Sequence, residues 1–64
     1  MICEKELQIH DLMLNYSTIY IDDFKIEDVE HTRFNFHDTN VEIDGVKINY
    51  YDIQDMYGVI DADI

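Results

Sequence analysis

Four side chains in this sequence belong to the types that commonly bind zinc in proteins: Cys3, His10, His31 and His37. None of them has a second ligand at the close Cys-x-x-Cys or His-x-x-x-His spacing that is typical of zinc sites. His31 and His37 lie at the ends of a segment in which polar and apolar residues alternate, a pattern typical of a strand with one face in solvent. The sequence therefore predicts no metal site.

Residues 40–45 superficially resemble a calcium-binding loop, because Asn40, Glu42 and Asp44 occupy alternate positions before a glycine. The position at which such a loop carries a bidentate Glu is occupied by Tyr51. The intervening residues are apolar and fit a strand. A β-hairpin is therefore the preferred interpretation of this segment.

No residues in the sequence are arranged in a recognisable catalytic motif. Gly45 and Gly58 are the two glycines, which excludes a glycine-rich phosphate loop, and neither Ser17 nor Cys3 lies in a nucleophile motif. A chain of 64 residues also has little volume for a pocket that could hold a substrate. We expect no enzymatic activity and no cofactor.

The most informative chemical feature is negative charge. Fifteen Asp and Glu residues against four Lys and Arg give a formal net charge of −11. Such a charge on a small body creates a strong negative field, which disfavours direct binding to nucleic acid or to anionic membranes and favours a basic protein surface. The alternative is that the acidity only keeps the chain soluble.

The carboxylates concentrate at predicted turns and in a connecting segment. The predicted partner-binding residues are Asp22, Asp23, Glu27, Asp28, Glu30 and Asp44, together with Tyr20, Tyr50 and Tyr51. Pairs such as Asp28 with Glu30, or Asp61 with Asp63, would be about 6.5 to 7 Å apart on an extended backbone, which resembles the repeat of backbone phosphates. Tyrosines favour interfaces because they offer a large contact area at a low entropic cost.

The elements that must position these residues follow from an internal repeat. Residues 12–26 and 34–48 share one pattern when shifted by 22 positions. Alternating apolar residues, and Asp-Gly between two alternating runs, predict a three-stranded meander in each copy. In the second copy Ile43 should pair with Val46 and in the first copy Ile21 with Phe24.

The predicted fold class is mainly β, with α+β possible: a small antiparallel sheet or sandwich built from the two meanders. Residues 27–32 connect them. The inner surface should include Leu12, Leu14, Phe34 and Phe36. Residues 2–11 fit either a short strand or a helix, and residues 50–57 predict a short C-terminal helix that is capped by Gly58.

Composition predicts a single folded domain over residues 1–64. The apolar fraction of 47% is too high for a disordered chain. The single cysteine, the absence of a signal-peptide pattern and the absence of a long apolar run predict a cytoplasmic protein, in the host cytoplasm if a phage encodes it. The sequence contains no Pro that would protect the open edges of the sheets, so a homodimer through an edge is a further expectation.

Two functions of different classes agree with these features. The first is an inhibitor that mimics nucleic acid on the basic surface of a host protein, as small acidic anti-defence proteins of phages and mobile elements do. The second is a small structural or regulatory module, predicted to be homodimeric, that binds a protein through tyrosines or through a strand edge. Loss of binding with rising salt would favour the first function.

Overall fold

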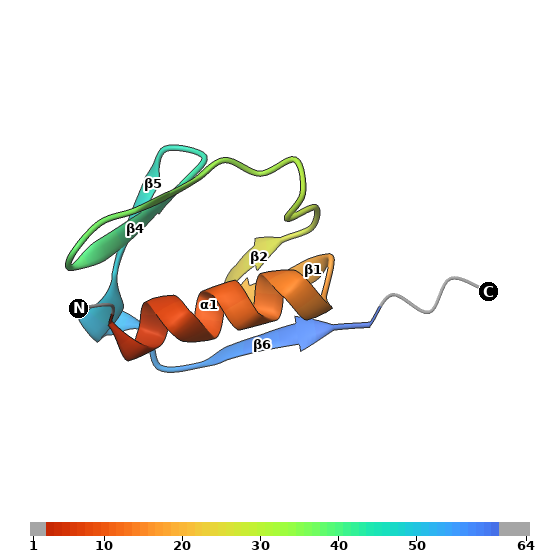
Figure 1. The fold of residues 1–64 in the computed structure, drawn as a ribbon, viewed down its shortest axis with the longest axis horizontal. Helices are drawn as coiled ribbons and strands as arrows, with labels where there is room; N and C mark the ends of the chain where they lie inside the picture. The colour runs from red at the N-terminus through yellow and green to blue at the C-terminus, as the bar shows by residue number, and fades with distance from the viewer. Residues whose placement is uncertain (1–2, 61–64) are drawn as a thin grey trace.

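The computed structural model describes residues 3–60, which form one α-helix, a short 3₁₀ helix and two antiparallel sheets (Figure 1). The elements in chain order are α1 (Glu4–Asn15), β1 (Thr18–Ile21), β2 (Phe24–Ile26), β3 (Phe34–Phe36), β4 (Asn40–Ile43), β5 (Val46–Asn49), the 3₁₀ helix η1 (Tyr50–Asp52) and β6 (Met56–Val59). The first sheet has the strand order β2-β1-β6, and the second has the order β3-β4-β5. The fold class is therefore α+β, with the helix at the N-terminal end of the described chain rather than at the C-terminal end.

Helix α1 replaces the first strand of the predicted N-terminal meander. Ile9 is fully buried, and Leu12 and Met13 pack against the core, so the buried residues follow the three-and-four spacing of a helix. Leu14 is 85% exposed, because it lies on the opposite side of the helix. The prediction of a strand that carries Leu14 inward is wrong, whereas the helical alternative for the segment before it is confirmed from Glu4 onward.

The β1–β2 hairpin has the predicted register. Ile21 pairs with Phe24, and Tyr20 pairs with Lys25. Asp22 adopts a positive φ of 54° in the turn, a conformation that Asp tolerates better than most residues. The hairpin therefore forms without glycine.

The second sheet is the predicted meander. Ile43 pairs with Val46, and Glu42 pairs with Lys47. The turn residues Asp44 and Gly45 have φ values of 51° and 88°, as a two-residue turn with positive φ at both positions requires. This copy of the repeat therefore folds as the sequence predicts, although the side chain of Val46 is 47% exposed at the edge of the sheet.

The C-terminal part of the described chain is a strand instead of the predicted helix over residues 50–57. After the short helix η1, β6 runs antiparallel to β1 and pairs Ile21 with Met56 and Thr18 with Val59. Gly58 does not cap a helix. It lies under the ring of Tyr16, and a Cβ at this position would be 2.0 Å from the ring Cδ2 atom.

The core lies where α1, both sheets and η1 meet. In Figure 1, α1 lies along β6 and β1, which it contacts, and the strands β4 and β5 stand above it. The buried apolar residues are Ile9, Ile19, Ile21, Ile26, Val29, Val41, Ile43, Tyr50 and Ile53. Each sheet therefore has one inner and one outer face. Within residues 3–60, no helix is both long enough and apolar enough to cross a membrane.

Candidate binding surface

The negative charge of the described chain lies on its surface. Of the 13 Asp and Glu residues among residues 3–60, ten are exposed and three are half-buried. The exposed ones are Glu4, Asp11, Asp23, Glu27, Asp28, Glu30, Asp38, Asp44, Asp52 and Asp55. Because none of the 13 is buried, this charge is available to a partner.

Two of the four Lys and Arg side chains interact with neighbouring groups of the chain itself. Lys5 donates to the carbonyl oxygen of Ile53. Lys25 lies 3.4 Å from the carboxylate of Glu27 and 6.0 Å from the centre of the Tyr20 ring. These two neighbours, Tyr20 first, raise the pKa of Lys25. Lys47 lies opposite Glu42 in the register of β4 and β5, and its side chain is exposed.

Two of the predicted binding carboxylates stabilise turns. The Oδ1 atom of Asp22 accepts hydrogen bonds from the backbone N–H groups of Gln54 and Asp55, at 3.0 and 2.9 Å. The Oδ1 atom of Asp44 accepts one from the N–H group of Arg33, at 3.0 Å. Asp22 therefore fixes its hairpin to the segment before β6, and Asp44 fixes its hairpin to the segment before β3. These hydrogen bonds connect the two hairpin tips to different segments and do not connect one tip to the other.

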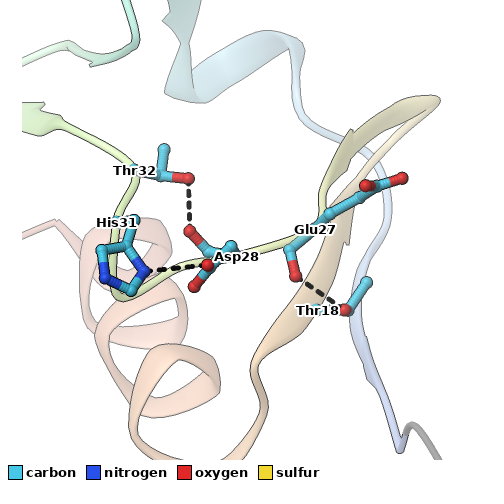
Figure 2. A network of polar contacts seen from close by, with 5 residues as sticks. All are labelled: Thr18, Glu27, Asp28, His31 and Thr32. Atoms are coloured by element: carbon cyan, nitrogen blue, oxygen red, sulfur yellow. Dashed lines mark hydrogen bonds and ion pairs between the residues drawn. The ribbon is translucent and has the colours of Figure 1, made fainter.

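The connecting segment between β2 and β3 is folded into a turn (Figure 2). The carbonyl oxygen of Asp28 accepts hydrogen bonds from the N–H group of His31, at 3.2 Å, and from the hydroxyl of Thr32, at 2.6 Å. Before the turn, Thr18 donates to the carbonyl oxygen of Glu27, at 3.0 Å. The expected extended backbone at Asp28 and Glu30 is therefore wrong, because these local bonds bend the chain.

The second pair with the proposed phosphate-like spacing, Asp61 and Asp63, lies outside the described residues.

Each of the three histidines lies beside one carboxylate. His31 Nδ1 is 2.8 Å from Asp28, and this hydrogen bond and charge raise the pKa of His31. The other two pairs are His37 with Glu42, at 2.8 Å, and His10 with Glu6, at 3.4 Å. Within residues 3–60, no three His, Cys, Asp or Glu side chains are grouped so that they could hold a metal ion.

The predicted tyrosines have three different environments. Tyr20 lies on the outer face of the first sheet, where it stacks on Tyr57 at 5.0 Å between ring centres. Tyr51 is 87% exposed. Tyr50 is 1% exposed and belongs to the core, so it is not part of the binding surface. Tyr57 was missed from the sequence, because its position beside Tyr20 depends on the long-range pairing of β6 with β1.

The buried hydroxyl of Tyr50 provides a test of the packing. Burial, followed by the charge of the nearby Glu6, raises the pKa of Tyr50 to about 12. The buried hydroxyl lies near Glu6 but makes no hydrogen bond of acceptable geometry within residues 3–60. Below pH 10 the phenol is neutral in the folded and unfolded states. Between pH 10 and 12 it ionises only in the unfolded chain, so the free energy of unfolding should fall by roughly 2–3 kcal/mol.

The variant Tyr50→Phe should lose this pH dependence and remain at least as stable as the natural chain at pH 7, because it removes an unpaired buried hydroxyl. Urea unfolding at pH 7, 10 and 11.5 measures both effects. The exposed neighbour Tyr51 supplies the control, since Tyr51→Phe should leave the pH dependence unchanged. If the free energy of unfolding fell equally with pH in both variants, Tyr50 would be ionised in the folded state at the higher pH values.

The described surface thus combines exposed carboxylates with a stacked pair of tyrosines, and both features are suited to binding. Glu27 and Tyr20, two of the predicted binding residues, are brought together by Lys25, which contacts both. Comparisons with protein-family models, with curated proteins and with solved structures found no match to this chain.

Proposed function

We propose that this chain is a small, non-catalytic binding protein that occupies the basic, nucleic-acid-binding surface of a partner protein and thereby inhibits it. The observation that supports the proposal most strongly is the exposure of the carboxylates: ten of the 13 within residues 3–60 are exposed. Exposed carboxylates compete for the same Lys and Arg side chains that bind phosphate. An anti-defence inhibitor that is encoded by a phage or a mobile element is the setting in which we expect such a protein.

The carboxylates best suited to this role are those that the fold does not use. Asp22 and Asp44 accept hydrogen bonds from backbone N–H groups, so their removal would disturb the fold as well as the charge. Asp23, Glu27 and Glu30 are exposed, and the side chain of Glu27 lies beside the exposed Lys25. A test of charge should therefore neutralise Asp23, Glu27 and Glu30 together.

An affinity pull-down from the native host, with identification by mass spectrometry, would supply the partner. Against that partner, the triple variant Asp23→Asn, Glu27→Gln, Glu30→Gln should associate roughly tenfold more slowly at low salt, because lost charge removes long-range attraction before it changes shape. Surface plasmon resonance measures the association rate, and circular dichroism confirms the fold.

The exposed cation Arg33 provides a control of opposite sign. Arg33→Gln makes the chain more negative, so its association rate should stay equal or increase. If the triple variant kept its full association rate at low salt, the electrostatic proposal would be rejected.

The second candidate function is a protein-interaction module that binds through the outer face of the first sheet. The stacked pair of Tyr20 and Tyr57 favours it, since the ring of Tyr57 is half exposed and aromatic side chains are enriched at interfaces. This function predicts binding that is insensitive to salt and lost in Tyr57→Ala. A dimer formed through the same face would depend on the same residue.

A further inference from the structure

An apolar groove runs between the second half of α1 and β3, which touch where the ring centre of His10 lies 4.3 Å from that of Phe36. It encloses about 600 Å³ and is lined by His10, Met13, Leu14, Val29, Glu30, Thr32, Phe34 and Phe36. Leu14, which forms part of the helical wall, is 85% exposed, an unusual exposure for a large apolar side chain. On the opposite wall, Phe34 and Phe36 are stacked at 5.9 Å and are only partly buried.

The wall formed by β3 is also a free strand edge. Strand β3 pairs with β4 on one side only. The N–H group of His37 donates to the carbonyl of Asn40, and bonded and non-bonded pairs alternate along an antiparallel ladder. Phe34 and Phe36 therefore fall in non-bonded pairs, and their backbone N–H and C=O groups point away from β4. Within residues 3–60, no hydrogen bond outside the sheets uses these groups.

These features together fit the addition of a strand. An extended peptide that pairs with the free edge would place alternate side chains between β3 and α1, against Leu14 and Met13, and the others in solvent. Exposed edges of native sheets are usually protected by Lys, Pro or a covering element. The groove side of β3 presents two Phe residues instead.

The charge of the groove indicates the chemistry of its occupant. Glu30 lines it, and no Lys or Arg does. A second copy of this chain would bring a further formal charge of −11 to the same place, which disfavours self-pairing. We propose that the groove binds an extended segment of the partner in which apolar residues alternate with Lys or Arg, added as a strand to β3. This inference depends on the proposed function, because it specifies how the basic partner is held.

The test uses an eight-residue synthetic peptide of alternating valine and arginine as the probe. On its addition, the amides of Phe34 and Phe36 should shift in ¹⁵N-labelled protein spectra, and their hydrogen exchange should slow, while they exchange freely without peptide. Two further peptides carry N-methyl groups on all valines or on all arginines. Only one of these sets of amides faces β3, so one peptide should bind at least roughly tenfold more weakly and the other should keep its affinity.

Two exposed leucines on α1 distinguish binding in the groove from nonspecific apolar binding. Leu14→Asn should weaken peptide binding roughly fivefold or more. Leu7→Asn should leave it unchanged, because Leu7 is 54% exposed on the same helix but does not line the groove. Both changes are at exposed positions, so the fold should survive.

The outcomes distinguish this inference from the proposed function. Suppose that binding weakens with salt, that both methylated peptides bind equally well, and that Leu14→Asn has no effect. This result would overturn strand addition but would agree with the proposed acidic inhibitor. Binding at Phe34 and Phe36 that persists in high salt would support strand addition and count against electrostatic competition. Absence of shifts at both amides would overturn the inference. Shifts that depend on protein concentration alone would assign the groove to a second copy and also overturn it.

Discussion

Ile43→Asp should unfold the chain. Ile43 lies in β4, is 1% exposed and faces the core that α1 and the two sheets share. The substitution removes apolar burial and places a carboxylate in the apolar core, at a cost of roughly 4 kcal/mol or more. A chain of this size has only about 5 kcal/mol of stability to lose. Circular dichroism at 20 °C should show loss of the native spectrum.

The neighbouring residue gives the control for this prediction. Glu42 points to the outer face of the same strand, where its carboxylate contacts His37 at 2.8 Å. Glu42→Gln keeps the side-chain shape and should change the free energy of unfolding by less than about 1 kcal/mol. If both variants were equally unstable, the alternation of inner and outer residues along β4 would be refuted.

Asp22→Ala should produce the second-largest loss of stability, although Asp22 is only half-buried. Its carboxylate accepts two backbone hydrogen bonds from the segment before β6, and its N–H group donates to the carbonyl of Asp55 at 2.8 Å. Alanine leaves two donors without this acceptor and also disfavours the φ of 54°. We expect a loss of roughly 2–4 kcal/mol in urea unfolding.

Two further substitutions test the cause of that loss. Asp22→Asn keeps an acceptor oxygen and tolerates positive φ, so it should lose only about 1 kcal/mol. Asp23→Ala changes the adjacent exposed residue and should stay within about 0.5 kcal/mol of the natural chain. An equal effect of alanine at both positions would show that the two hydrogen bonds contribute nothing.

The hairpins could be predicted from the sequence because their information is local. Asp44 and Gly45 specify a turn, and the alternation on either side fixes which residues pair, so the pairs Ile43 with Val46 and Glu42 with Lys47 follow. In the first hairpin Asp22 supplies the positive φ that the turn requires, although no glycine follows it. The strand registers of both hairpins could therefore be predicted without knowledge of the rest of the fold.

The helix was mispredicted because its pattern is ambiguous over a few residues. Leu12 and Leu14 occupy alternate positions as in a strand, and the internal repeat makes them equivalent to Phe34 and Phe36 in the second copy. In the structure Ile9 is buried and Leu12 and Met13 pack against the core, and these three residues have helical spacing. A run of three apolar residues, Leu12 to Leu14, cannot distinguish these periods when the chain on either side is mostly polar.

The last strand could not be predicted from local spacing. Ile53, Met56 and Tyr57 have the spacing of a helical stripe, yet β6 is extended because β1 offers it a free edge. The paired residues of β1 and β6 are 35 to 41 positions apart in the sequence, so the pairing leaves no signal in the local spacing of β6. The exposure of most carboxylates could be expected from the sequence, because charged side chains usually lie at the surface, but the stacking of Tyr57 on Tyr20 could not.

The pairing of β6 with β1 also determines when the chain can fold during its synthesis. Helix α1 and the two hairpins involve neighbours in the sequence, so they can form as soon as each has left the ribosome. The first sheet is complete only after Met56 to Val59, near the end of the described residues, have been made. Until then β1 lacks one of its two neighbours, and the nascent chain is most open to aggregation and proteolysis at that stage.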